Sequence, residues 1–101
     1  MASVKWASPA FEQLEALSER IAIEIIERVD LLSSFPEMGV SLNSRYPQLS
    51  NCRQLIIRRK HRLIYEYVAS ANTVYVLAVQ HCRQQLPTAA DLRRKRVVGS
   101  E

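Results

Sequence analysis

Residues 53–83 read RQLIIRRKHRLIYEYVASANTVYVLAVQHCR, and this stretch decides the fold. It holds three runs rich in branched and aromatic side chains, at 53–57, 62–68 and 73–79, which is the composition of β-strands. Only short polar segments separate the runs, and such short connections join antiparallel neighbours. The third run is almost continuously apolar, which indicates an inner strand covered by helices. The stretch therefore predicts a small three-stranded antiparallel sheet.

Two amphipathic helices are predicted before this sheet. Ser8-Pro9 is typical of a helix start, and apolar residues recur at helical spacing over 11–17 and again over 21–32. Pro36 should end the second helix, because proline cannot continue a helix and disfavours helical backbone at the residue before it. We expect a helical hairpin packed on the sheet, and the alternative is one long bent helix. The alternating segment 3–6 predicts an edge strand.

The C-terminal residues predict a short helix and a tail. Thr88, which follows Pro87, can cap a helix that reaches Arg96, and residues 97–101 are expected to fray. A length of 101 residues fits a single domain over 1–101, in which 87–101 form this helix and tail. The predicted fold class is α+β.

Charge is distributed unevenly along the chain. Residues 1–51 carry four basic and seven acidic side chains, a net charge of −3, whereas residues 52–101 carry ten basic and three acidic side chains, a net charge of +7. Such asymmetry indicates a nucleic acid or an acidic protein as the partner of the C-terminal half. The alternative is that the charge only keeps the protein soluble and that the chain ends in a basic tail.

Several classes of protein and site are excluded. Two cysteines, Cys52 and Cys82, without a signal peptide do not form a secreted disulfide framework, and no apolar run reaches the ~20 residues that span a bilayer. We expect a cytoplasmic protein with reduced thiols. His61 and His81 with the two cysteines lack the spacing of a zinc site, and glycine-rich phosphate loops are missing. No metal and no cofactor are therefore predicted.

The candidate site is a basic cluster at one end of the sheet. Arg58-Arg59-Lys60-His61 forms the tip of a hairpin, Arg62 opens the middle strand, and His81 and Arg83 close the last strand. We predict Arg53, Arg58, Arg59, Lys60 and His61 as nucleic-acid-binding residues.

The strand register decides which side chains meet at this end. If Arg59-Lys60 forms a two-residue turn, Ile57 lies opposite Arg62 and Arg53 lies opposite Glu66. If Ala71-Asn72 forms the second turn, Arg62 lies opposite His81, and Arg83 shares their face. If the second turn has three residues, 70–72, Arg62 lies opposite Gln80 instead, because a slip of one residue moves each side chain to the other face.

The register in which Arg62 lies opposite His81 predicts phosphoryl chemistry. Arg62 and Arg83 would hold a scissile phosphate and stabilise its growing negative charge. His81, with an ordinary pKa near 6.5, would exchange a proton near neutral pH, and RNA would supply its own 2′-hydroxyl as nucleophile. Arg62, His81 and Arg83 are thus the predicted catalytic residues. The alternative is a solvated hairpin end with one histidine at the edge of the core.

The chain resembles the RelE/ParE toxin superfamily over most of residues 4–86. The resemblance rests on FPEMG (35–39), RQLII (53–57), RLIYEY (62–67) and VLAVQHCR (76–83), in this order and spacing. It implies the toxin of a bacterial type II toxin–antitoxin module, with an acidic, partly disordered antitoxin as partner.

Two activities occur in this superfamily. RelE-like members cut mRNA in the ribosomal A site, and ParE-like members inhibit DNA gyrase. Arg62 and Arg83 match the arginines that RelE-like enzymes use around the scissile phosphate, which favours mRNA cleavage. Leu55 and Ile57 stand where RelE-like proteins often have basic residues, and no tyrosine follows Tyr75. Gyrase inhibition and non-catalytic nucleic-acid binding therefore stay as alternatives.

Overall fold

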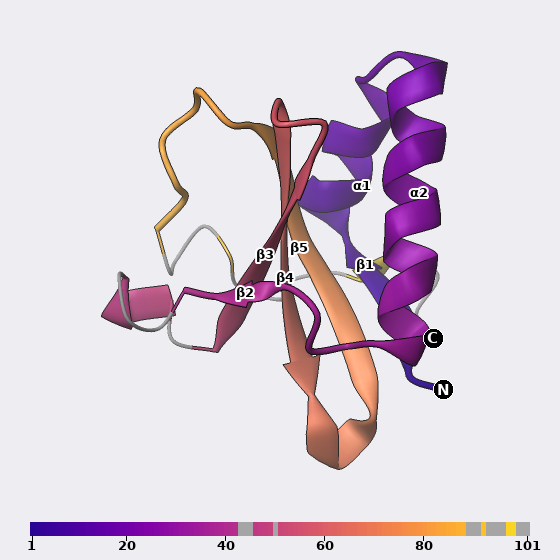
Figure 1. Ribbon diagram of the computed structural model, residues 1–101, viewed down its shortest axis with the longest axis vertical. Coiled ribbons are helices and arrows are strands. Elements are labelled where there is room, and N and C mark those ends of the chain that lie inside the picture. The colour runs from indigo at the N-terminus through magenta and orange to yellow at the C-terminus, as the bar shows by residue number, and fades with distance from the viewer. Residues whose placement is uncertain (43–45, 50, 89–91, 93–96, 99–101) are drawn as a thin grey trace.

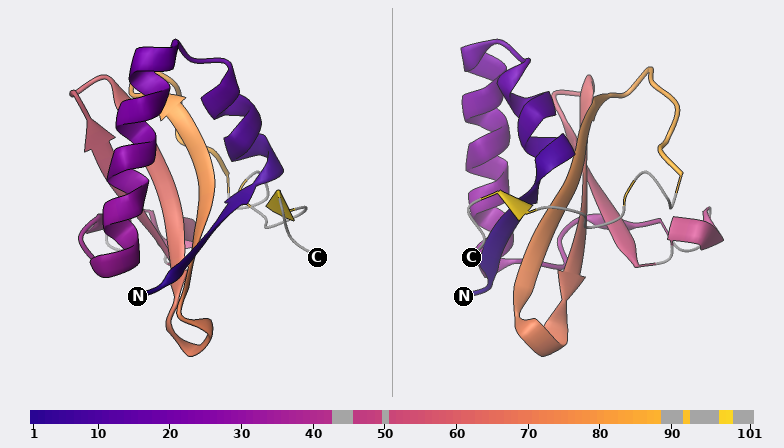
Figure 2. Two further views of the ribbon diagram at one scale, coloured as in Figure 1. Left: turned by 90° about the vertical axis from the view of Figure 1, so that its right-hand side faces the viewer. Right: turned by 180° about the vertical axis from the view of Figure 1, so that it is seen from behind.

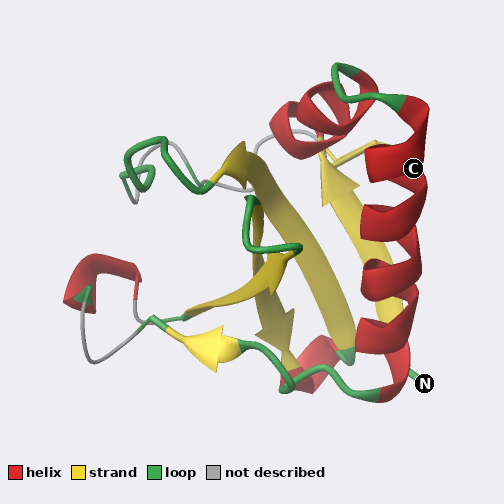
Figure 3. Cartoon of the chain, turned by 45° about the horizontal axis from the view of Figure 1, so that its top comes forward, coloured by secondary structure: helices red, strands yellow, loops and turns green. Residues whose placement is uncertain are grey.

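The computed structural model describes residues 1–42, 46–49, 51–88, 92 and 97–98. Its elements in chain order are β1 (Ser3–Ala7), α1 (Ser8–Glu15), α2 (Glu19–Ser34), β2 (Val40–Ser41), η1 (Pro47–Leu49), β3 (Cys52–Ile57), β4 (His61–Val68), η2 (Ala69–Ala71), β5 (Thr73–His81) and β6 (Val97–Val98). The strands form one sheet in the order β2-β3-β4-β5-β1-β6, and both helices lie on the same face of it (Figure 1, Figure 3).

The three strands predicted from residues 53–83 are confirmed as β3, β4 and β5, which pair antiparallel in that order. The sheet as a whole is mixed, because β1 pairs in parallel with β5. The predicted edge position of residues 3–6 is wrong, since β1 lies between β5 and β6. Residues 97 and 98 were expected to fray, but they pair with Ala7 and Trp6 of β1. These pairings join residues far apart in the chain, which local sequence patterns do not reveal.

Two separate helices form, so the alternative of one long bent helix is wrong. Pro9 lies in the first turn of α1, where its missing N–H costs no hydrogen bond. α2 ends at Ser34, and Phe35 leaves helical backbone before Pro36, as predicted. The predicted helix after Pro87 falls on residues that lie mostly outside the described part of the chain. Among the described helices, none has the length and apolar character needed to cross a membrane.

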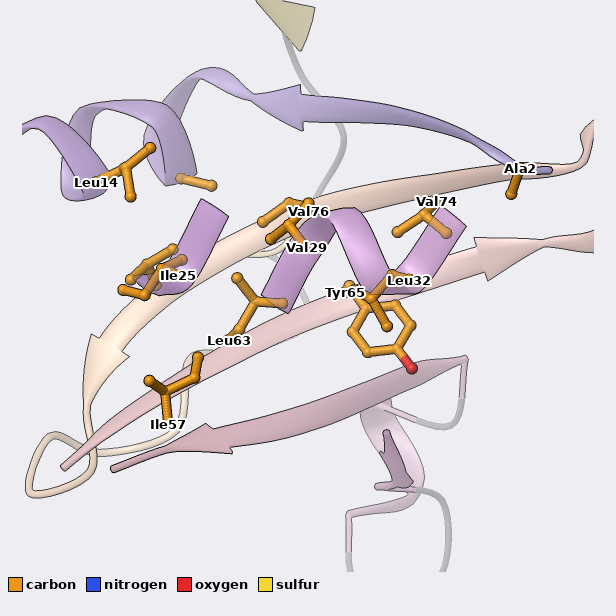
Figure 4. Close-up of a cluster of buried hydrophobic side chains, with 12 residues drawn as sticks. Ala2, Leu14, Ile25, Val29, Leu32, Ile57, Leu63, Tyr65, Val74 and Val76 are labelled. Atoms are coloured by element: carbon orange, nitrogen blue, oxygen red, sulfur yellow. The ribbon is translucent and has the colours of Figure 1, made fainter. Parts of the chain in front are cut away.

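The main core lies between the helices and the sheet (Figure 4). α1 contributes Ala10 and Leu14, and α2 contributes Ile25, Val29 and Leu32. The sheet supplies the side chains that alternate onto this face of its strands, namely Ile57, Leu63, Tyr65, Val74, Val76 and Val79. Full burial of each large aliphatic side chain contributes about 1.5–3 kcal/mol, so this layer fixes which strand residues point toward the helices.

A second, smaller core covers the opposite face of the sheet. It joins Ile64, Leu77 and Ala78 of the sheet to Leu42, Leu49 and Leu92, with Tyr46 and Leu86 packed at its margin. Neither α1 nor α2 lies on this face, and the segments 46–49, which include η1, and 82–88 run beside it (Figure 2). The described residues leave a hollow on this face beside Arg62 of β4.

Candidate functional site

A tight turn closes the β3–β4 hairpin. The Lys60 N–H donates to the Ile57 carbonyl (3.1 Å), and the two central residues, Arg58 and Arg59, have φ of 54° and 60°. Positive φ at both central positions defines the I′ class of turn, which usually uses Asn-Gly. The sequence carries no such signal here, so a turn centred on two arginines is not predictable from composition.

This turn overturns the predicted register of the first hairpin. Ile57 lies opposite His61 and Arg53 lies opposite Tyr65, whereas the predicted partners were Arg62 and Glu66. The physical reason is that the turn begins one residue earlier than predicted.

The second hairpin decides where Arg62 points. Val68 pairs with Thr73 across η2 and Asn72, whose φ of 47° is left-handed backbone that asparagine tolerates. A bulge then interrupts the ladder between Ile64 and Tyr65, and Arg62 lies opposite Gln80. The register in which Arg62 faces His81 is therefore wrong. The alternative pairing of Arg62 with Gln80 is found, but it arises from the four residues 69–72 and a bulge and not from the three-residue turn 70–72.

Arg62 and His81 consequently lie on opposite faces of the sheet. His81 pairs with His61, and both histidines line a hollow with Gln13, Ala16 and Leu17 of the helical face. Arg62 faces the smaller core on the other side. The predicted convergence of guanidinium and imidazole on one phosphate is thus not formed.

Arg62 lines a hollow of about 450 Å³ on the face away from the helices, called the Arg62 hollow below. Its other lining residues are Tyr46, Gln84, Gln85, Leu86, Pro87 and Thr88. The Arg62 Nη2 donates to the carbonyls of Cys82 (2.7 Å) and Gln84 (3.2 Å), which holds the segment after β5 against the sheet.

The charge of Arg62 has no acidic partner among the described residues. The ion pairs of that part of the chain join Arg53 to Glu37 and Arg58 to Glu24. In the same part of the chain, the Nε of Arg62 is buried and makes no hydrogen bond. A half-buried guanidinium paired only with carbonyls favours a bound anion, because carbonyl oxygens do not neutralise its charge.

His61 and His81 form an edge-to-face pair with ring centroids 5.3 Å apart. Burial, followed by the charges of His81 and Lys60, lowers the pKa of His61 below its ordinary 6.5. The Nδ1 of His81 accepts the backbone N–H of Arg83 (3.1 Å). Neutral His81 therefore carries its proton on Nε2. Arg83 itself is exposed in the turn that follows β5.

The predicted nucleic-acid-binding residues divide into two groups. Arg58, Arg59, Lys60 and His61, called the basic tip below, lie together at the end of the β3–β4 hairpin. Arg59 and Lys60 are exposed, while Arg58 also pairs with Glu24 of α2.

Arg53 lies apart from the basic tip, about 17 Å away along β3 at the usual strand rise. Its Nη1 donates to the Gly39 carbonyl (2.8 Å) and the Glu37 carbonyl (3.2 Å). Arg53 therefore holds the segment after α2 in place.

Tyr46 is the site residue that sequence reasoning missed. It lies between β2 and η1 and lines the Arg62 hollow because this part of the chain packs against the smaller core. An isolated tyrosine among loop residues carries no signal of a site. Within the described residues, no three His, Cys, Asp or Glu side chains are grouped so that they could hold a metal ion.

Comparison with known families settles the relationship of the chain. The family model described as "ParE toxin of type II toxin-antitoxin system, parDE" matches residues 4–86. The chain belongs to the RelE/ParE family of type II toxins. The resemblance carried by the sequence motifs is confirmed.

Solved toxin structures share the fold of this toxin. The toxin–antitoxin complex RelBE2 of Mycobacterium tuberculosis matches with a TM-score of 0.70 and 27% identity, over 79% of this chain and 96% of that chain. The isolated Escherichia coli RelE toxin matches with a TM-score of 0.68 and 14% identity, over 84% of this chain and 88% of that one.

The intact E. coli RelBE complex matches with a TM-score of 0.68 and 13% identity, over 83% of this chain and 100% of that chain. At these identities the E. coli proteins show a common fold alone. No curated protein matches the chain.

Proposed function

We propose that this toxin is an mRNA endoribonuclease of RelE type that acts on the translating ribosome. The observation that carries the proposal is the Arg62 guanidinium, which lies at a hollow without a carboxylate partner among the described residues. The 27% identity to the toxin–antitoxin complex RelBE2 adds support. The proposed target lies in the cytoplasm.

The chemistry follows from the charge of the site. The 2′-hydroxyl of the RNA gives its proton to water and attacks the adjacent phosphorus, and negative charge grows on the phosphate oxygens. The bond to the 5′-oxygen then breaks, and the leaving oxygen takes a proton from water. Arg62 and Arg83 are proposed to stabilise this charge, and loss of one such donor typically lowers the rate by about 10²–10³-fold. His81 lies on the other face of the sheet, so we assign it no proton transfer at Arg62.

The basic tip is proposed to contact the phosphate backbone of RNA. Arg59 and Lys60 project from a turn with no acidic partner among the described residues. Such exposed charges accelerate association and make affinity strongly dependent on salt. Arg53 is excluded from this surface, since it is engaged with the carbonyls of Glu37 and Gly39.

An acidic antitoxin is the proposed protein partner. Exposed apolar side chains lie on α2 and on the segment that follows it, among them Ile23, Leu31, Phe35, Met38 and Val40. Val40 belongs to β2, which is the end strand of the sheet. An antitoxin segment that covers this apolar surface and adds to β2, with acidic residues toward the basic tip, suits both features.

Inhibition of DNA gyrase is the second candidate function. The observation that favours it is the family match itself, whose description names ParE toxins. Leu55 and Ile57 also give β3 an apolar character where RelE-like toxins often carry basic residues. A gyrase inhibitor would block DNA supercoiling and leave mRNA intact.

The test compares mRNA 5′ ends on translating ribosomes with the supercoiling activity of gyrase. Arg62→Ala removes the charge, and Arg62→Lys keeps it, so cleavage should be lost in the former and partly kept in the latter. Arg20→Ala is the matched control, because Arg20 is an exposed arginine in the first turn of α2. Gyrase inhibition without cleavage would replace the proposal with the second candidate.

A further inference from the structure

We infer that the Arg62 hollow is a subsite for a single nucleotide, in which Tyr46 stacks on the base while Arg62 holds the adjoining phosphate. This inference rests on the proposed function and names the group that the hollow receives. It assigns Tyr46 a role in positioning single-stranded RNA.

The dimensions of the hollow suit one nucleotide. Its volume of about 450 Å³ lies within the range of about 300–1,000 Å³ that small-molecule sites occupy. Its lining includes Arg62, which carries a guanidinium, Tyr46, which carries an aromatic ring, and Gln85, which carries an amide. A nucleotide presents the matching groups, namely a phosphate, a base with two flat faces, and polar base edges.

Tyr46 is held firmly enough to act as a platform. Its backbone N–H donates to the Leu42 carbonyl (2.8 Å), and its carbonyl accepts the Leu49 N–H (2.7 Å). Leu42 and Leu49 are themselves buried in the smaller core, against which the tyrosine ring packs. A ring fixed in this way loses little entropy on binding, and base stacking on aromatic side chains is insensitive to sequence.

Unpartnered polar atoms beside the hollow indicate a ligand. Within the described residues, the Nε of Arg62 and the Oε1 of Gln80 are buried without hydrogen-bond partners, and these two residues face each other across β4 and β5. The Nε2 of Gln80 donates to the Gln85 carbonyl (3.3 Å), which connects the pair to the wall of the hollow. Buried polar atoms are normally satisfied, so a bound group that reorients Arg62 would complete this network.

The Gln85 side chain is the candidate reader of the base edge. It is exposed at the hollow, and an amide can both donate and accept hydrogen bonds. The side chain of the neighbouring Gln84 is already engaged, because its Oε1 accepts the backbone N–H of His81 (2.8 Å). Stacking on Tyr46 would therefore supply affinity for any base, and Gln85 would supply the preference among bases.

The direct test is a ¹⁵N NMR titration with a 2′-O-methyl trinucleotide, which cannot be cleaved, at low salt and up to millimolar concentration. We expect amide shifts at Tyr46, at residues 84–86 and at Thr88 in the wild type. Tyr46→Leu should weaken binding by roughly 5- to 150-fold, the range for one base stack. Tyr67→Leu is the matched control, because Tyr67 packs on the helical face of the sheet. The affinity of this variant for the trinucleotide should equal that of the wild type.

The outcomes separate this inference from the proposed function. Absent shifts, or equal affinities of wild type and Tyr46→Leu, would overturn the subsite, whether or not ribosomal cleavage persists. Loss of antitoxin affinity without loss of RNA affinity in Tyr46→Leu would also overturn it, and would assign the hollow to the antitoxin. Trinucleotide binding that depends on Tyr46, combined with intact mRNA on ribosomes, would keep the subsite and reject the nuclease.

Discussion

Replacement of Tyr65 by phenylalanine should destabilise this toxin far more than the loss of one oxygen atom suggests. Tyr65 is fully buried, and its hydroxyl donates to the Pro36 carbonyl (2.8 Å) and accepts the Gly39 N–H (2.9 Å). A Cβ built on Gly39 would lie 2.7 Å from this ring, so the segment after α2 is fitted closely to Tyr65.

The magnitude follows from the two lost hydrogen bonds. Each contributes about 0.5–1.5 kcal/mol net, and both backbone partners are left without a side-chain partner, so we expect a loss of about 2 kcal/mol. For a domain of this size, that loss lowers Tm by roughly 8–16 °C. Urea denaturation followed by circular dichroism measures the change, and the m-value should stay constant because the ring still packs.

Tyr67→Phe is the control for this prediction. The Tyr67 hydroxyl bonds to the Asn72 Oδ1 (3.0 Å) in an exposed position, where water replaces the lost partner. Its removal should cost less than about 0.5 kcal/mol. Equal and small losses in the two variants would show that the Tyr65 hydroxyl does not anchor the segment after α2.

Three further predictions concern titration and backbone strain. Burial, and then the charge of Glu66, raises the pKa of Cys52 to about 11, so iodoacetamide should label Cys82 first by mass spectrometry, and equal labelling rates would contradict this. Burial lowers the pKa of His61, so the stabilising contribution of neutral His61 is present above pH ~6.5 and is lost as pH falls through the lowered pKa. The free energy of unfolding should therefore drop from about pH 7 to pH 5, and it should drop less in His61→Gln. Parallel pH profiles of the wild type and this variant would contradict the prediction. Arg59 has a φ of 60°, so Arg59→Gly should raise the free energy of unfolding in urea by about 0.5–1 kcal/mol while weakening RNA affinity, and a less stable variant would show that the turn is not strained.

Local patterns in the sequence were sufficient for most of the elements. The branched and aromatic runs over 53–83 became β3, β4 and β5, and Pro36 follows the end of α2 as expected. The parallel pairing of β1 with β5 was missed, because it depends on where the two helices return the chain. No short-range pattern carries that information.

The candidate site was predicted less well than the fold, because its geometry depends on turns. Two arginines in left-handed backbone and one bulge set the register, and neither has a local signal. In the observed register Arg62 and His81 lie on opposite faces of the sheet, although both were correctly predicted to lie at one end of it. Tyr46 was missed since only tertiary packing brings it to Arg62.

The most direct test of the account is the rate of mRNA cleavage on translating ribosomes by the wild type and by Arg62→Ala, with Arg20→Ala as control. We predict ribosome-dependent cuts by the wild type and the control, and a loss of about 10²–10³-fold for Arg62→Ala with its fold intact by circular dichroism. Cleavage by Arg62→Ala at the rate of the wild type, or intact mRNA in all three reactions, would contradict the account.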